Sequence, residues 1–495
     1  MYKIAEELQQ ELKDFYLPFG GSLDEPNRWV RLAAIIRWDE IEKRYARQFS
    51  KEMGALAKRS RMALGALIIK QRLRISDDET LEQIRENPYL QFFLGLSGFT
   101  NEMPFDASMM VYFGKRFGAK TLGEINELLI AEKKQEIVED EKPEKPKKKD
   151  PPNQGQLILD ASCVPQDIRH PTDLGLTNDA RLATGEIIDI LHSARNSAEK
   201  KPRTYRECAR RDYLRCVKKR RLGMKEFYKG RKKQLQYLAR NLRSIKKLLE
   251  EVELSGLPHR SYRGLLVATE ILRQQTEMQR KKQHSIQGRI VSLAQPHVRP
   301  IVRGKARTAV EFGAKISVSV LDGFTYVDRI SWDAYNEGGD LPGQIATYRR
   351  RYGRYPESVH ADKIYRTRDN HAYCKARGIR MSAPRLGRPP ADQEIRKSVQ
   401  RQIREDERKR VEVEGKLGES KRVYGLHRVA TKRADTSETT IMMAVMVMNL
   451  SKILRDLFVS FIRTLMTRGL FLSFRLISLG LNRTTFYLAF SGSLT

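Results

Sequence analysis

The chain has 495 residues, which is too long for one ordinary hydrophobic core and long enough for two to four domains. Hydrophobic residues make up 40% of it, which excludes a wholly disordered chain, and 93 Lys and Arg against 61 Asp and Glu give a net charge of +32. A chain this basic attracts polyanions, so we expect a nucleic acid as its partner. The alternatives are a charge that serves solubility and a ribosome-like structural role.

Cysteine usage and the apolar segments indicate the compartment. The four cysteines form no C-x-x-C pair, so we expect neither a zinc site nor a disulfide framework, which fits a reducing cytosol. The charged, amphipathic N-terminus is unlike a signal peptide. The most apolar stretch, residues 457–481, contains Arg463, Arg468 and Arg475, each expensive at the centre of a bilayer. We therefore expect a packing helix, no membrane partner and a cytoplasmic protein.

The first third of the chain predicts an all-α N-terminal domain and a linker. Residues 1–135 show no β alternation, and Ser76 and Glu79 form a capping box before an apolar run that Asn87-Pro88 interrupts. Residues 136–156 carry four prolines and no large apolar residue after Val138. This composition is typical of a linker between domains.

A short apolar run follows the linker and ends in a carboxylate. Residues 157–159 read Leu-Ile-Leu, and Asp160 comes directly after them. The run predicts a buried strand that delivers Asp160 at its C-terminal end. An Asp at the end of one strand is weak evidence by itself, because many such residues only cap the next loop.

A large basic insertion comes next, at about residues 178–300. Leucine and isoleucine recur every three or four residues from 235 to 249, which predicts long helices with one apolar stripe. Residues 191–310 hold 32 Lys and Arg against 9 Asp and Glu, which is +23 of the total charge. This density favours a basic arm that lies along a phosphate backbone over a pair of helices with a merely solvated exterior.

Strand signals return after the insertion. Residues 314–320 and 324–330 alternate around Gly323 and predict a hairpin. A helix is expected at 333–351 and a strand at 358–362, ending in Asp362. The remaining expected elements are a helix at 368–377, a strand at 379–382, a charged helix at 391–417 that contains Glu414, and a last helix at 438–455 that covers the sheet.

Without the insertion, the predicted order is that of an RNase H-like mixed α/β domain. Its sheet has helices on its faces and spans residues 157–455, with an apolar, basic tail at 456–495. Two of its strands deliver an Asp, and a later helix presents Glu414. Phosphodiester chemistry with two metal ions needs such a set of hard oxygen ligands, which suit magnesium.

The helix with Glu414 carries the most specific motif. Residues 403–428 read IREDERKRVEVEGKLGESKRVYGLHR, and Arg410, Glu414 and Lys421 occupy the R, E and K positions of a Y-x2-R-x3-E-x6-K signature. The chain therefore resembles the DDE insertion-sequence transposases, in the large branch marked by that signature. Glu407 stands at the tyrosine position, which puts in doubt the role of that tyrosine and not the metal site.

Shorter pieces extend the resemblance over roughly residues 30–450. In chain order, they are SDDETLEQIRENPYLQFFLGL in the N-terminal stretch, Leu159-Asp-Ala-Ser162, His170-Pro-Thr-Asp-Leu174, Glu311-Phe-Gly-Ala-Lys315 and Ala361-Asp-Lys-Ile-Tyr365. The resemblance implies a catalytic and metal-binding triad of Asp160, Asp362 and Glu414, holding two Mg2+ (or Mn2+) ions. It also implies a prokaryotic, nucleoid-associated enzyme.

The resemblance further implies the reaction. The enzyme would bind double-stranded DNA at terminal inverted repeats, and a water would attack each transposon end. The freed 3′ hydroxyl would then attack target DNA, without a covalent protein–DNA intermediate. Since both ends must be held together, at least a homodimer is expected on DNA.

The helical period supports Glu414 independently of the motif. Arg410 lies one turn earlier and Lys421 two turns later, so the three side chains share one face, where the cations could hold the carboxylate or contact phosphate. Glu412 is the nearby rival. It points nearly opposite to Glu414, and Glu419 stands seven residues after it in place of a cation.

Other residues are candidates for DNA contact. Lys363 follows Asp362 directly, and within the insertion four consecutive cations stand out, namely Lys218, Lys219, Arg220 and Arg221. Lys363 and Tyr365 could equally support the sheet. Trp332 could stack on a flipped base, although burial in the core is the commoner fate of tryptophan.

Three rival functions remain open from the sequence. A nuclease of the same fold would cut DNA without joining it. A DNA-binding protein derived from a decayed transposase would bind without catalysis, and the tail after residue 456 leaves room for this reading. An RNA-binding scaffold would ignore both metal and the acidic triad.

Overall fold

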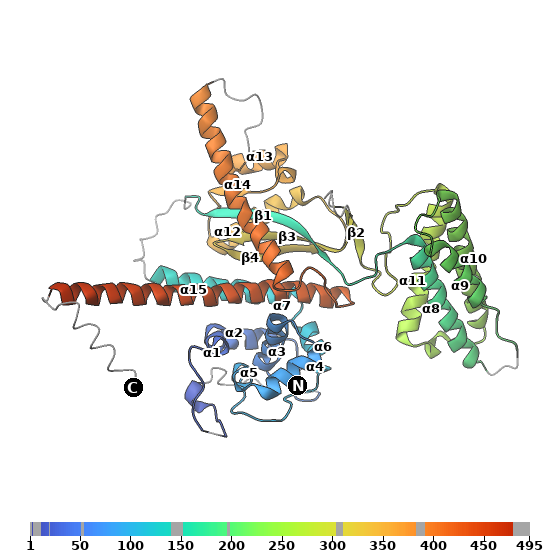
Figure 1. Cartoon of the computed structure of the whole chain (residues 1–495), viewed down its shortest axis with the longest axis horizontal. Helices are drawn as coiled ribbons and strands as arrows, with labels where there is room; N and C mark the ends of the chain where they lie inside the picture. The colour runs from blue at the N-terminus through green and yellow to red at the C-terminus, as the bar shows by residue number, and fades with distance from the viewer. Residues whose placement is uncertain are drawn as a thin grey trace. The chain divides into compact units, whose positions relative to one another are not determined.

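The computed structural model describes most of the chain, in two compact units. The described residues are 2, 11–18, 20–50, 54–139, 152–195, 199–302, 310–382 and 392–478. One unit comprises Met1–Pro146 with Met443–Thr495, and the other comprises Lys147–Met442 (Figure 1).

The N-terminal part of the first unit is helical, as predicted. Its elements are η1 (Leu12–Asp14), α1 (Arg28–Ile35), α2 (Trp38–Ala46), α3 (Ser60–Leu73), α4 (Asp77–Glu86), α5 (Pro88–Phe93), α6 (Met109–Arg116) and α7 (Ala119–Glu139). Ser76 caps α4 as predicted, because its side chain accepts a 3.1 Å hydrogen bond from the Glu79 backbone N–H, and the Glu79 side chain accepts a 3.0 Å bond from Gln83. Asn87 ends α4 and caps α5, whose first residue is Pro88.

Helix α15 (Ala434–Ser478) belongs to the first unit from Met443 onward. The Asn449 amide donates a 2.8 Å hydrogen bond to Asn126, and Arg72 donates a 2.7 Å bond to Ser451. From the sequence we expected residues 438–455 to cover the sheet. These hydrogen bonds instead join the helix to N-terminal helices, and its apolar pattern could not identify them as its partners. Among the residues that the structure describes, no helix is long and apolar enough to cross a bilayer.

The second unit contains a curled mixed sheet, which confirms the mixed α/β class. Its strands are β1 (Gln156–Pro165), β2 (Arg299–Val302), β3 (Val310–Leu321), β4 (Phe324–Ser331), β5 (Ser358–His360) and β6 (Arg380–Met381). The order is β2-β3-β1-β5-β6, and β4 also pairs with β3. Strand β3 pairs antiparallel with β1, β2 and β4, whereas β5 runs parallel to both β1 and β6.

The predicted hairpin is β3–β4. Its turn consists of Asp322 and Gly323, with φ of 53° and 77°, the left-handed pair that a tight two-residue hairpin requires. The helix expected at 333–351 begins later, because residues 332–336 are irregular and η3 (Glu337–Asp340) precedes α12 (Leu341–Tyr352), which has proline in its first turn.

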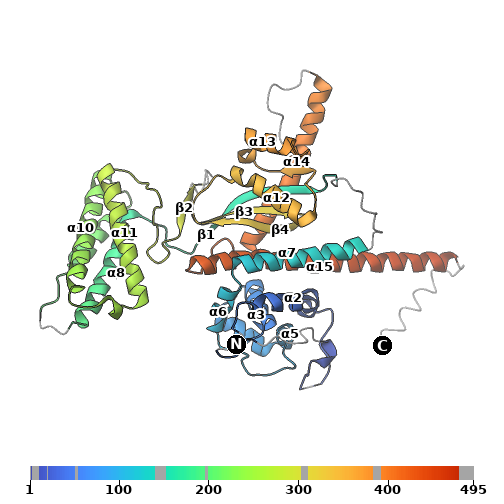
Figure 2. The same ribbon diagram turned by 180° about the vertical axis from the view of Figure 1, so that it is seen from behind.

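The other helices of the sheet domain follow the predicted order. They are η4 (Lys363–Tyr365), α13 (Arg368–Lys375) and α14 (Gln393–Arg422). Helix α14 packs against β1 and β5, crossing one face of the sheet in Figure 1, and Figure 2 shows α12 over the opposite face. Gln344 of α12 donates a 2.9 Å hydrogen bond to Asp328 of β4.

The insertion is a helical bundle between β1 and β2. It consists of α8 (Asp173–Ser193), α9 (Arg206–Val217), α10 (Met224–Leu248), η2 (Leu254–Gly256) and α11 (His259–Lys281). The predicted apolar stripe faces its core, where Leu238 and Ile245 are buried. Asp173 is also buried there and accepts hydrogen bonds from Arg231, Gln275 and Arg289, which tie α8, α10, α11 and the segment after α11 together.

Candidate active site

The three carboxylates predicted from the sequence line one open cleft of about 990 Å3, which we call the acidic cleft. Asp160 comes from β1, Asp362 follows β5 and Glu414 comes from α14. The same cleft is lined by Arg410 and Lys421. The fold therefore gathers five of the predicted site residues at one surface.

Parallel pairing aligns the first two carboxylates. Ile158 of β1 pairs with His360 of β5, and Asp160 and Asp362 each stand two residues further along. The predicted end of the strand at Asp160 is wrong, because β1 continues to Pro165 by pairing with β3. Asp160 therefore projects from the middle of a strand, whereas Asp362 stands beyond the end of β5.

Local backbone bonds hold both Asp side chains. The Asp362 carboxylate accepts a 2.7 Å hydrogen bond from the N–H of Lys363 and caps η4. The Asp160 carboxylate accepts a 2.8 Å bond from the N–H of Ala161. Each bond leaves the rest of its carboxylate able to accept from another group.

Arg410 connects the other two carboxylates. Its guanidinium lies 3.4 Å from Asp362 and 3.0 Å from Glu414, the latter as an i,i+4 pair on α14. The Asp362 and Glu414 side chains stay 51% and 54% exposed, so both are accessible from the cleft. Glu412 is exposed but does not line the cleft.

Negative charge is concentrated around Asp160. Burial raises the pKa of its carboxyl, and the neighbouring charges of Asp362 and Glu414 raise it further, while the N–H of Ala161 and the Arg410 guanidinium lower it. A cation that enters the cleft would relieve this repulsion, and Arg410 supplies part of that charge in the structure as it stands.

The donors fit a divalent ion by chemistry, since carboxylate oxygens are the hard ligands that Mg2+ prefers. Their side chains are, however, too widely spaced in this structure to share one ion. Among the described residues, no three His, Cys, Asp or Glu side chains are gathered closely enough to hold a metal ion.

The structure adds a fourth acid that sequence reasoning missed. Glu337 of η3 lines the acidic cleft and forms an ion pair with Lys315 of β3. The Lys315 ammonium also donates a 2.7 Å hydrogen bond to the carbonyl of Tyr335. The sequence segment that ends in Lys315 resembles the transposase family and could have drawn attention to this lysine. No rule of sequence spacing links that lysine to Glu337.

A polar network that joins α14 to β5 and β6 was also missed. The Arg380 guanidinium on β6 donates 2.7 and 2.9 Å hydrogen bonds to the two carboxylate oxygens of Asp406 on α14. His360 of β5 is fully buried, and its Nδ1 lies 3.5 Å from the same carboxylate. Asp406 stands eight residues before Glu414, so this network fixes α14 against the strands that position Asp362.

The remaining candidates lie outside the acidic cleft. Lys363 is exposed and does not line it. The four consecutive cations, Lys218 to Arg221, are exposed in the turn between α9 and α10, where Lys219 pairs with Glu226 at 2.7 Å. Trp332 is half-buried, with its ring edge against His297 and its N–H donated to Glu438 at 2.8 Å.

Comparisons with known proteins bear on both units. Residues 359–451 match the family model described as "Transposase DDE domain", and residues 19–116 match the one described as "Transposase domain (DUF772)". The first match includes Asp362, Arg410 and Glu414. In these two segments the chain is therefore similar to insertion-sequence DDE transposases.

One curated relative is a protein of Rhizobium meliloti described as "Uncharacterized protein ORF8 in nfe locus". It is 31% identical over 144 residues, which are 29% of this chain. The match spans 64% of that protein's own length, less than two thirds. No solved structure matches the chain.

Proposed function

We propose that the chain is a DDE transposase that cleaves double-stranded DNA at the ends of a transposon and joins the 3′ ends to target DNA. One observation carries the proposal. Asp160, Asp362 and Glu414 come from two adjacent parallel strands and the helix packed on them, and they line a single cleft. Asp362 and Glu414 also lie within the segment that matches a transposase DDE domain.

The strand order supports an RNase H-like core for this domain. An antiparallel set of β4, β3 and β1 continues into the parallel strands β5 and β6, and helices cover both faces. The insertion leaves this order intact, since it enters after β1 and returns at β2. Without the insertion, the strands form the mixed sheet that the predicted order of elements implies.

Asp160, Asp362 and Glu414 are the residues that would hold two Mg2+ or Mn2+ ions. When bound, such ions activate the attacking oxygen and stabilise charge on the phosphate and the leaving oxygen. The raised pKa of Asp160 favours this role, because a carboxyl surrounded by like charges gains most from a cation.

The cations of the cleft would act on the phosphate. Arg410 bonds two of the carboxylates, and once released from them its planar guanidinium can bind a phosphate through two parallel hydrogen bonds. Lys421 lines the same cleft two turns further along α14 and would add a single positive charge.

The reaction would proceed as two transfers at phosphorus. A water oxygen attacks the phosphodiester at each transposon end, and the bond to the 3′ oxygen breaks, which leaves a free 3′ hydroxyl. That hydroxyl attacks a phosphodiester of target DNA and displaces its 3′ oxygen. Since both ends must be joined at one target, we propose at least a homodimer on DNA, acting on the nucleoid in a prokaryotic cytoplasm.

The test uses oligonucleotides that carry the ends of the element. Pre-cut ends with a 3′ hydroxyl should join to plasmid DNA in Mg2+ or Mn2+, and ends that lack this hydroxyl should not. Cleavage without joining would identify a nuclease instead. Binding without either reaction, and unaffected by metal, would identify a DNA-binding protein derived from a transposase.

A further inference from the structure

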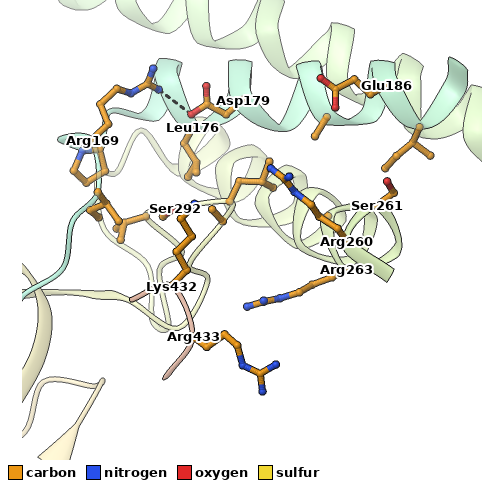
Figure 3. A pocket seen from close by; sticks show the side chains of 18 of the residues that line it. Arg169, Leu176, Asp179, Glu186, Arg260, Ser261, Arg263, Ser292, Lys432 and Arg433 are labelled. Carbon is orange, nitrogen blue, oxygen red and sulfur yellow. Dashed lines mark hydrogen bonds and ion pairs between the residues drawn. The ribbon is translucent and has the colours of Figure 1, made fainter. Parts of the chain in front are cut away.

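A second cleft lies between the helical insertion and the segment that connects α14 to α15. It has a volume of about 820 Å3 and shares no lining residue with the acidic cleft among the described residues (Figure 3). Its walls are the segment after β1, one face of α8, the first two turns of α11, residues 291–294 and residues 432–433. We call it the basic cleft.

Cations from three separate segments line the basic cleft. They are Arg169 after β1, Arg260 and Arg263 on α11, and Lys432 and Arg433 before α15. Figure 3 shows the side chains of Arg260, Arg263 and Lys432 between the insertion and the connecting segment, whereas that of Arg433 extends away from them. Residues so far apart in sequence meet here only because the insertion folds against this part of the chain.

Three of these cations lack an acidic partner. Arg169 pairs with Asp179 at 2.8 Å, and Arg433 pairs with Asp435 at 2.8 Å. By contrast, Arg260, Arg263 and Lys432 form no ion pair within the described residues and are exposed. Unneutralised cations that converge on one hollow create a local positive potential, which attracts an anionic ligand.

The connecting segment is fixed to the strand that carries Asp160. Val429 donates a 2.9 Å hydrogen bond to the carbonyl of Pro165, and its own carbonyl accepts a 2.8 Å bond from Asp167. Arg428 adds a 2.7 Å hydrogen bond to the Asp167 carboxylate. The wall that holds Lys432 is therefore attached to the end of β1 and does not move independently of it.

We propose that the basic cleft binds the phosphodiester backbone of DNA, as an anchoring point separate from the acidic cleft. This inference rests on the proposed function for the identity of the nucleic acid. Exposed cations distributed over several chain segments suit a polymer of phosphates, whereas a site for one phosphate commonly gathers short charge-assisted bonds around it. The apolar side chains of Leu176, Ile187 and Val291 also line the cleft, and they offer no hydrogen bonds to bases.

One acidic side chain offers a test in which DNA affinity should increase and not decrease. Glu186 of α8 lines the basic cleft and forms no ion pair within the described residues. A phosphate bound in this cleft would be repelled by its carboxylate. Neutralising Glu186 should therefore strengthen DNA binding, while neutralising the cations should weaken it.

The first measurement compares two triple variants of the full chain. Arg260→Ala, Arg263→Ala and Lys432→Ala together remove the unpaired cations of the basic cleft. Arg243→Ala, Lys246→Ala and Lys247→Ala remove three exposed cations of α10 that do not line it. The probe is a labelled DNA duplex of arbitrary sequence, titrated by anisotropy at several salt concentrations in EDTA.

The cleft variant should flatten the slope of log K against log salt by up to about 2.7, which is about 0.9 for each lost phosphate contact. The α10 variant should flatten it less. Equal effects of the two variants, or an unchanged slope in the cleft variant, would overturn the inference. Duplex RNA bound more tightly than DNA, or inorganic phosphate displacing the duplex at equal phosphate concentration, would also overturn it.

The second measurement keeps the inference falsifiable if the triple variant folds poorly. Glu186→Gln should raise the affinity for the same duplex severalfold, whereas Glu250→Gln, outside the cleft, should leave it unchanged. An unchanged affinity of Glu186→Gln would show that no phosphate lies in the basic cleft.

Parallel joining assays separate the two failures. If the parent joins DNA ends but the cleft variants bind like the parent, only this inference fails. If the parent neither cleaves nor joins but the cleft variants lose affinity, the proposed function fails and the DNA-binding site stands.

Discussion

The acidic and basic clefts of the unit Lys147–Met442 are built in opposite ways. The acidic cleft depends on register, since pairing of β1 with β5 places Asp160 beside Asp362 and one helix adds Glu414. The basic cleft depends on packing, since a bundle inserted after β1 meets a segment more than a hundred residues later in the chain. The comparison separates carboxylates that strand pairing holds in register from cations that converge because two distant parts of the chain pack together.

The sharpest test of this separation is Glu414→Gln. It should reduce cleavage and joining by at least about a thousandfold, because the neutral amide keeps the size but loses the charge that holds a cation. DNA affinity in EDTA should remain near that of the parent. Gel assays of cleavage and joining, with anisotropy for binding, measure both.

Glu412→Gln is the matched control, since this residue is exposed on α14 away from the acidic cleft. It should retain most of the activity. An inactive Glu412→Gln beside an active Glu414→Gln would shift the signature by two residues, and activity in both would contradict the DDE assignment.

The next effect tests how α14 is positioned. Asp406→Asn should weaken the bidentate pair with Arg380 and lower the cleavage rate roughly ten- to a hundredfold, as loss of a residue that orients a metal ligand does. The Mn2+ concentration for half-maximal cleavage should rise while DNA affinity stays constant. A fall in rate with unchanged Mn2+ dependence would mean that Asp406 serves stability alone.

A smaller effect is expected at the turn between α9 and α10. Replacing the four consecutive cations Lys218, Lys219, Arg220 and Arg221 with alanine should weaken binding to every DNA sequence and flatten the salt slope by up to about 0.9 per lost contact. Catalysis on saturating DNA should stay near the parental rate. An unchanged salt slope would restrict the phosphate contacts of the insertion to the basic cleft.

The smallest effect concerns pH. Burial, together with the charges of Arg263 and Arg299, lowers the pKa of His297 to about 4. As pH falls from about 6.5 to about 4, the unfolded chain takes up a proton at this residue before the folded chain does, so the free energy of unfolding should decrease.

The decrease due to His297 should be on the order of 1 kcal/mol, because the ring is only partly buried and solvent screens its charge. Urea unfolding at several pH values measures it, with His297→Gln as the control. A His297→Gln curve that falls as steeply as that of the parent would exclude this histidine as the cause.

The acidic cleft was largely accessible to prediction, because its signals are local. A strand of three apolar residues before Asp160, a second strand before Asp362 and a helical face with Arg410 and Glu414 can each be recognised without knowledge of the rest. The length of β1 could not, because Ala161 to Pro165 are held extended by β3, which lies about 150 residues later. Pairing partners at that distance leave no periodic signal.

The residues around these carboxylates were missed for the same reason. Asp406 reads as one more charge on a helix of alternating signs until β6 brings Arg380 against it. Glu337 reads as part of a helix until η3 places it beside Lys315. The basic insertion was recognised by its charge, but which cations converge depends on how the bundle meets Lys432.

The attachment of the bundle has a consequence for modular design. Gly313 of β3 pairs with Pro165, the last residue of β1, on one side and with Arg299, the first residue of β2, on the other. A side chain here would collide with the carbonyl of Val164, at 2.0 Å from an added Cβ, so the junction admits only glycine. The bundle thus leaves and re-enters the sheet at points about 10 Å apart, two strand spacings. A short loop could span that gap, so the bundle could be replaced without interrupting the sheet.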